Sequence, residues 1–192
     1  MVIVKRLFIA IFLFSFNSSA VEPFNLYGIK LNSPFTDYFP NSELDDKRPV
    51  SYTYDDYYEI RKKQLPEGIS VFNRYIVIID SDNLIQGVLG SANIDDDYDS
   101  CISTQKKIVK DFNKRYGLVF RGYEKDFTKV GRNRLSYKYA ARDDDNNKLT
   151  ITCSKVIKGK ITNKTNRISL SYGSKAFTDS VKAYHESNRK KK

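Results

Sequence analysis

The sequence predicts an α+β protein in which an antiparallel sheet packs on one central amphipathic helix. A helical apolar stripe runs through residues 95–117, and alternating apolar and polar residues mark several strands on both sides of it. The two cysteines fall on the apolar faces of the helix and of one strand, which predicts one disulfide. A short helix is expected near the C-terminus, because Ala176, Phe177, Val181 and Tyr184 recur at helical spacing.

The central helix is expected over Asp95–Gly117. Cys101 lies on the same side as the other apolar residues of the stripe, which are Ile108, Val109, Phe112 and Tyr116. Asp99 or Ser100 is expected to cap the first turn, because a side-chain oxygen there accepts a backbone N–H that has no partner inside the helix. Gly117 is expected to end the helix, because glycine readily adopts the left-handed conformation.

Cys101 and Cys153 are the two cysteines of the chain. Cys153 shares one strand face with Leu149 and Ile151, so both thiols point at the same core. We expect a disulfide that closes a loop of roughly 50 residues and contributes about 4 kcal/mol. Two free buried cysteines, or one catalytic thiol, are the alternatives.

The first 20 residues have the pattern of a cleaved signal peptide. Lys5 and Arg6 precede an apolar run over 7–16, and Ser18 and Ala20 place small side chains before a cut after Ala20. The run is shorter than the roughly 20 residues that a membrane span needs. We therefore expect export to the periplasm of a Gram-negative bacterium, with secretion, or an uncleaved N-terminal anchor, as alternatives.

The remaining chain is expected to form a single α+β domain over 21–188, followed by a basic tail over 189–192. Local patterns predict its elements in order: a short strand, turn and short helix over 25–40; a surface loop over 41–49; an interrupted strand over 51–60; a hairpin of 75–79 and 84–89; the start of a strand at 118–120; a second hairpin of 134–140 and 148–153; and a strand over 167–172. Gly87 is expected to mark a bulge or close packing, and Ser174 to cap the last helix.

Four tyrosines within seven residues form a candidate interaction surface: Tyr52, Tyr54, Tyr57 and Tyr58. Tyrosine combines apolar area with a polar tip, and it is enriched at binding surfaces. A half-buried strand with tyrosines on its wet face is the structural alternative. Glycosidase chemistry at the carboxylates of 55–56 is a further alternative, which requires a second carboxylate across a cleft.

The basic tail is the second candidate site, for anions: Arg189, Lys190, Lys191 and Lys192. Lys5 and Arg6 are the charged residues of 1–20, so the mature chain keeps 31 basic and 23 acidic side chains and a net charge of +8. Such a protein is suited to anionic envelope polymers, lipid headgroups or an acidic protein. A solvated surface with a frayed tail is the alternative.

The sequence predicts neither catalytic residues, nor a metal site, nor a cofactor. His185 is the single histidine, and zinc sites need several such ligands. Asp95, Asp97 and Asp99 have the alternate spacing of a calcium loop, but Ser100 and Lys106 stand where that loop needs glycine and glutamate. Nucleic acid is disfavoured as the partner of an exported chain.

Part of the chain resembles small exported proteobacterial proteins of uncharacterised function. The resemblance covers roughly 25–117 and rests on Tyr27-Gly-Ile-Lys-Leu, the hairpin 75–89, Cys101, and a helix that ends Arg115-Tyr-Gly117. Asn32 stands where these proteins usually have glycine. The resemblance implies an exported protein in which a helix packs on an antiparallel sheet, and it implies no catalytic residues.

The leading functional expectation is a non-enzymatic periplasmic protein that recognises another protein, of the inhibitor or immunity type. The alternative is a binder of anionic envelope material that uses the basic C-terminal segment. The effect of salt separates the two classes, because binding by exposed charges weakens steeply with ionic strength whereas a packed protein interface weakens less.

Overall fold

The computed structural model describes residues 24–67, 71–94, 97–129, 132–158 and 166–190. They form one antiparallel sheet of eight strands in the order β1-β2-β3-β4-β8-β7-β6-β5. The strands are β1 (Arg48–Pro49), β2 (Tyr58–Lys62), β3 (Arg74–Ile79), β4 (Ile85–Ile94), β5 (Arg121–Lys129), β6 (Arg132–Arg142), β7 (Lys148–Lys158) and β8 (Asn166–Gly173). The same residues form α1 (Tyr98–Tyr116), α2 (Lys175–Lys190) and two 3-10 helices, Phe35–Asp37 and Asn41–Asp46. The expected α+β class is confirmed; the expected signal peptide, 1–20, lies outside the described residues.

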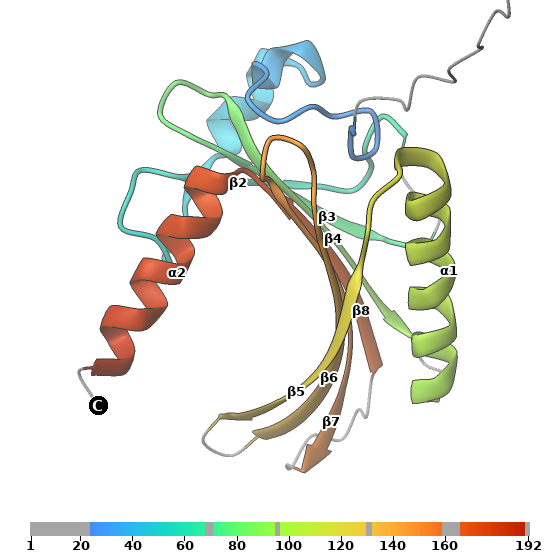
Figure 1. Ribbon diagram of the computed structural model, residues 1–192. Helices are drawn as coiled ribbons and strands as arrows, with labels where there is room; N and C mark the ends of the chain where they lie inside the picture. Colours follow the sequence, from blue (N-terminus) through green and yellow to red (C-terminus); the bar gives the residue numbers. More distant parts are fainter. Residues whose placement is uncertain (1–23, 68–70, 95–96, 130–131, 159–165, 191–192) are drawn as a thin grey trace, which may run out of the picture.

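The strands before and after α1 form a continuous sheet because β4 pairs with β8. Their register runs from Gly87 opposite Gly173 to Ile94 opposite Asn166. The two helices lie on opposite faces of this sheet, α1 on one and α2 on the other (Figure 1). The β5–β8 part of the sheet is curved, and its hollow side faces α2 (Figure 1).

Helix α1 confirms the strongest sequence prediction, with one correction at its start. The N-cap is Asp97, whose Oδ1 accepts a hydrogen bond from the backbone N–H of Ser100 at 2.7 Å. Asp99 and Ser100 lie inside the first turn, so the prediction placed the cap two or three residues too late. Gly117 ends the helix with φ 66°, the left-handed conformation that was expected of it.

The disulfide between Cys101 and Cys153 is confirmed, with the two Cα atoms 6.0 Å apart. Both cysteines are fully buried. The bond joins the first turn of α1 to the middle of β7, and α1 lies along β7 and β8.

The main core lies between α1 and the sheet. Helix α1 contributes buried side chains at helical spacing, and the strands contribute every second residue, as a sheet with one apolar face requires. The central members of this core are Val88, Ile108, Phe112, Leu149, Ile151, Ile168 and Leu170. Gln105 is also fully buried there, and its Nε2 donates hydrogen bonds to the carbonyl oxygens of Tyr137, at 2.9 Å, and Ile151, at 2.8 Å.

A smaller apolar cluster lies on the opposite face and holds α2. Its buried members are Val50, Tyr57, Ile78 and Phe177. The ring of Phe177 meets the ring of Tyr57 edge-on, with the centroids 5.1 Å apart. The N-cap of α2 is Ser174, whose Oγ accepts a hydrogen bond from Phe177 N–H at 3.1 Å, as the sequence predicted.

Several boundaries differ from the sequence predictions. The segment 41–49, expected as a loop, contains a 3-10 helix over Asn41–Asp46, and the strand expected over 51–60 is confined to Tyr58–Lys62. The strand expected at 118–120 begins at Arg121, in a segment whose mixed charges hid its period. The β3–β4 register shifts beside Gly87, where Ile78 pairs with Gly87 but Ile79 pairs with Ile85. This bulge agrees with the role expected of Gly87.

Candidate functional site

The four predicted tyrosines do not share one face. Tyr52 and Tyr57 pack in the α2 cluster, whereas Tyr58 packs against the main core and lies under the Nζ of Lys47, 4.9 Å from the ring centroid. Tyr57 is 9% exposed, and Tyr54 is 60% exposed. Tyr54 contacts α2 through Ser187 and through the ring of Tyr184, with the centroids 5.3 Å apart. The segment therefore covers one side of α2 and leaves Tyr54 as its most accessible ring.

The four basic residues predicted as a tail fall into two groups. Arg189 and Lys190 belong to the last turn of α2. Lys191 and Lys192 lie outside the described residues. Arg189 is exposed and lines a groove between α2 and the sheet, so the structure brings it next to cations that are distant in sequence.

The floor of this groove is the polar face of the sheet. Strand neighbours alternate between faces, so residues next to buried Leu149, Ile151 and Cys153 point toward α2. The register aligns these residues in rows across the strands, because directly opposed residues share a face. One row is Leu89, Ser171, Thr150 and Ala140, and the next is Ser91, Ser169, Thr152 and Lys138. A third row pairs Lys148 with Arg142 at the end of the groove beside the β6–β7 turn, called the near end below.

The groove itself is open and has a volume of about 590 Å³. The strands contribute Leu89, Lys138, Arg142, Lys148, Thr150, Ser171 and Tyr172, and α2 contributes Phe177, Thr178, Asp179, Val181, Lys182, His185, Glu186 and Arg189. Tyr52 completes the lining from the segment that flanks α2. Apolar, hydroxyl and charged groups thus occur together in one concave surface.

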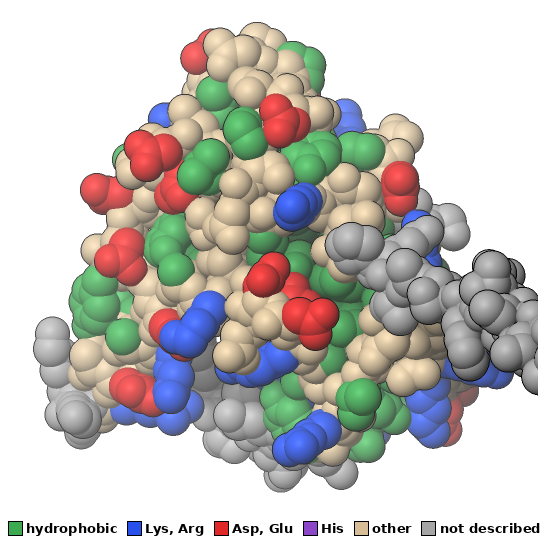
Figure 2. All heavy atoms as spheres, turned by 45° about the horizontal axis from the view of Figure 1, so that its top comes forward, with side chains coloured by type: hydrophobic (Ala, Val, Ile, Leu, Met, Phe, Trp, Pro, Cys, Tyr) green, Lys and Arg blue, Asp and Glu red, His purple; other side chains and the backbone are tan. Residues whose placement is uncertain are grey.

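The charge of the groove is predominantly positive. Its lining holds five lysines and arginines and two carboxylates, Asp179 and Glu186. Both carboxylates have a helical cation one turn away, with Lys175 at 2.6 Å from Asp179 and Lys182 at 3.8 Å from Glu186. Figure 2 shows Lys/Arg and Asp/Glu side chains interspersed on the α2 side of the molecule, at the lower left. The charged residues that the sheet contributes to the lining are all cations, so the floor is more positive than the outer wall.

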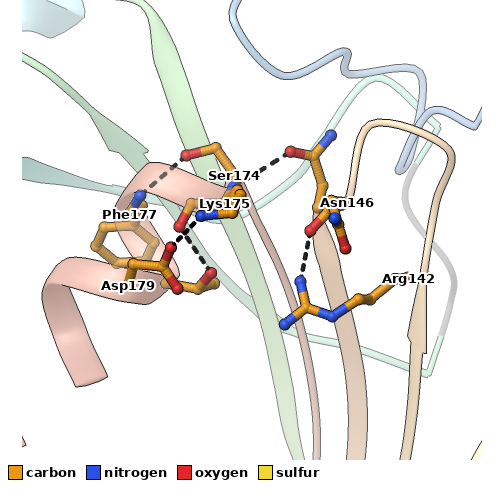
Figure 3. Close-up of polar contacts among 8 residues, drawn as sticks. Arg142, Asn146, Ser174, Lys175, Phe177 and Asp179 are labelled. Atoms are coloured by element: carbon orange, nitrogen blue, oxygen red, sulfur yellow. Dashed lines mark hydrogen bonds and ion pairs between the residues drawn. The ribbon is translucent and has the colours of Figure 1, made fainter. Parts of the chain in front are cut away.

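The cations around Asp179 lower the pKa of its carboxyl group. The hydrogen bond from Lys175 lowers the pKa of the Asp179 carboxyl, and the charges of Lys175, Arg142 and Lys182 lower it further. Arg142 belongs to the end of β6 and Asp179 to α2, and the two lie on opposite walls of the groove (Figure 3). The largest contribution therefore comes from Lys175 on the same helix, and Arg142 adds a smaller one from across the groove.

A polar network holds α2 to the turn between β6 and β7. Asn147 accepts a hydrogen bond from Lys175 N–H at 3.3 Å, and its Nδ2 donates to Asp143 at 3.0 Å. Tyr172 donates its hydroxyl hydrogen to the same Asp143 carboxylate at 2.5 Å. Arg142 donates to the carbonyl oxygen of Asn146 at 2.6 Å, which sets the position of its guanidinium at the groove mouth (Figure 3).

Two kinds of feature are absent from the described part of the chain. No group of three His, Cys, Asp or Glu side chains is placed to hold a metal ion in those ranges. Within the same ranges no helix has the length and apolar content to span a bilayer.

Comparison with known proteins does not assign the groove a role. No protein-family model, no curated protein and no solved structure matches the chain. The resemblance to small exported proteobacterial proteins therefore stays a prediction.

The sequence by itself does not predict the groove, although its strands carry a signal. Apart from Ala140, the outward-facing positions near the end of β6 and the start of β7 are basic or hydroxyl side chains at a spacing of two, which is the period of a strand. What remained hidden was that α2 lies over those positions. The sequence predicts the basic end of α2 as a separate tail, whereas Arg189 lies in a wall of the groove.

Proposed function

We propose that the protein is an exported, non-enzymatic binding protein that takes an anionic ligand in the groove between α2 and the sheet. The observation that carries this proposal is the excess of cations in one concave surface, five against two carboxylates. Clefts lined by one sign of charge concentrate ions of the opposite sign. The ligand class is that of the sequence-based alternative, an anionic envelope component, but the site includes sheet residues and not the basic end alone.

The disulfide supports the exported location. A fully buried disulfide that joins a helix to the sheet is a covalent part of the fold, and such bonds persist in oxidising compartments such as the periplasm. Together with the expected signal peptide and cleavage after Ala20, it favours a mature protein that folds after export.

The test of the groove is a binding titration with site mapping. Oxidised ¹⁵N-labelled protein lacking residues 1–20 is titrated with anionic probes at low salt: galacturonate oligomers, an oligoglutamate peptide and inorganic phosphate. Backbone resonance shifts are expected at 138–150 and 178–189, and they are expected to diminish as salt is added.

A charge-matched pair of variants separates the groove from net charge. The double variant Lys148→Glu/Arg189→Glu reverses two groove cations. Lys107→Glu/Lys110→Glu reverses two exposed cations of α1, on the other face of the sheet. The first is expected to lose anion binding and the second to keep it; equal losses would show that only the overall charge attracts anions.

Recognition of another protein, the leading expectation from the sequence, becomes the second candidate, and it rests on Tyr54, which is 60% exposed beside α2. An exposed tyrosine at the edge of a groove is a suitable anchor for a protein interface. This function predicts one saturable envelope protein that is retained in high salt and lost in Tyr54→Ser. Retention by Tyr54→Ser to the same level as the parent protein would remove the tyrosine from that interface.

A further inference from the structure

We infer that the groove binds an extended anionic oligosaccharide that lies along α2, rather than a small anion, a peptide or a lipid. This inference rests on the proposed function and adds the ligand's length and chemical class. Three features of the groove support it. They are the spacing of the cations, the hydroxyl groups among them, and the strands of the floor, whose backbone groups are already hydrogen-bonded to neighbouring strands.

The cations are distributed along the groove and not gathered at one point. Lys148 and Arg142 form a cross-strand pair at the near end, and Lys138 lies four residues earlier on β6. At about 3.3 Å per residue, that separation along the strand is roughly 13 Å. On α2, Lys182 and Arg189 are seven residues apart, which is about 10 Å at 1.5 Å per residue. One phosphate or carboxylate group cannot contact both ends.

The floor carries hydroxyl groups between and beside these cations. Thr150 and Ser171 are directly opposed on β7 and β8, in the row that also holds Leu89 and Ala140, and Thr152 and Ser169 form the next pair, beside Lys138. All four are half-buried, so they retain some accessible surface. Each hydroxyl donates one hydrogen bond and accepts others, which matches the hydroxyls that a sugar chain presents between its charged groups.

A peptide lacks its usual means of binding here. Peptides that lie on sheets pair with the free backbone groups of an edge strand. The floor of this groove consists of β4, β8, β7 and β6, each of which has a neighbouring strand on both sides. Their backbone groups are engaged in the sheet, so recognition depends on side chains.

A lipid tail is disfavoured by the small apolar part of the lining. Phe177 and Tyr172 are 7% and 3% exposed, so little of their surface is accessible. Tyr52, Leu89 and Val181 are only partly buried, but they pack against the cluster that fixes α2. These side chains hold the helix in place and leave no continuous apolar trough.

The experiment compares chain length and chemical class at one site. Galacturonic acid, trigalacturonate, hexagalacturonate and hexaglutamate are titrated into the oxidised protein, with resonance shifts as the readout. Hexagalacturonate is expected to bind at least about tenfold more tightly than galacturonic acid, because it engages both cationic ends at once. Its shifts are expected near Lys138 and near Lys148, whereas the monomer shifts one end only.

Conservative variants assign the two ends and the floor. Lys138→Gln and Lys148→Gln are each expected to reduce the hexamer's affinity toward that of the monomer, and the α1 variant Lys107→Gln is expected to leave it unchanged. Thr150→Val keeps the strand-forming shape and removes one hydroxyl. This variant is expected to weaken the binding of hexagalacturonate and to leave the binding of hexaglutamate unchanged.

The outcomes distinguish failure of the extended carbohydrate ligand from failure of the anion-binding groove. Equal affinity of monomer and hexamer, with shifts in the groove, would overturn the extended ligand and leave the anion groove standing. Hexaglutamate binding as tightly as hexagalacturonate would overturn the carbohydrate class. Absence of groove shifts with every probe would overturn the proposed function itself.

Discussion

Removal of the Cys101–Cys153 bond is the perturbation whose cost follows most directly from the structure. The bond links residues 52 apart in sequence, so it closes a loop of that length in the unfolded chain and lowers the conformational entropy of the unfolded state. In the chain-entropy model this loop corresponds to about 4 kcal/mol of unfolding free energy. Because whole domains are stable by only about 5–15 kcal/mol, we expect the reduced protein to be close to unfolding.

Two versions of the experiment separate the cross-link from the packing of sulfur. Reduction of the parent protein removes the bond and keeps both sulfur atoms, whereas Cys101→Ala/Cys153→Ala also leaves voids at two fully buried sites. The double variant should therefore be less stable than the reduced parent. A less restricted unfolded chain also exposes more surface, so the denaturant dependence of the unfolding free energy should rise.

The assay is urea unfolding followed by far-UV circular dichroism, since the chain has no tryptophan. The oxidised parent should show no reactive thiol, and its urea midpoint should exceed that of the reduced protein. The reasoning would be refuted by two free thiols in the oxidised protein. Oxidised and reduced unfolding free energies within about 1 kcal/mol of each other would refute it equally.

Two further predictions concern buried polar groups. Gln105→Leu removes the hydrogen bonds to the carbonyl oxygens of Tyr137 and Ile151 and should lower the unfolding free energy by about 1–3 kcal/mol, measured by urea unfolding. The control Lys106→Leu, at an exposed neighbouring position, should change it by less than about 0.5 kcal/mol. Burial raises the pKa of Tyr27, and burial followed by the Asp143 hydrogen bond raises that of Tyr172. Unfolded tyrosine titrates near about 10, so above that pH the unfolded chain loses protons that the folded chain keeps. The stability that these two tyrosines contribute should be fully present below about pH 10 and should fall as the pH rises further. The double variant Tyr27→Phe/Tyr172→Phe should reduce this dependence of the unfolding free energy on pH. An unchanged dependence would show that other groups cause it.

The elements that the sequence predicted well are those with strong local signals. Four of these elements depend on residues close in sequence: the stripe of α1, its Gly117 end, the hairpin around Asp80–Asn83 and the strand that holds Cys153. The predictions failed where local signals were weak or competed. Asp97, Asp99 and Ser100 are all suitable caps, and Asp97 is the one with the extended backbone of an N-cap, at φ −64° and ψ 170°.

The candidate site followed the opposite pattern. The tyrosines of 52–58 were grouped because they are close in sequence, yet side-chain alternation and the turn of the chain send Tyr57 and Tyr58 into different clusters. Lys138, Lys148 and Arg189 are far apart in sequence, and the β6–β7 pairing and the placement of α2 bring them to one groove.

The sequence by itself determined the class of the fold, the central helix and the disulfide partners, because period, capping chemistry and the presence of two cysteines are properties of single segments. Only the tertiary structure decided that β4 pairs with β8, which joins the two halves into one sheet, and that α2 lies over its polar face. Those features depend on contacts between segments distant in the chain. Many arrangements satisfy the same local patterns, and the packing of Phe177 on Tyr57 together with the Asn147–Lys175 hydrogen bond selects the one that forms the groove.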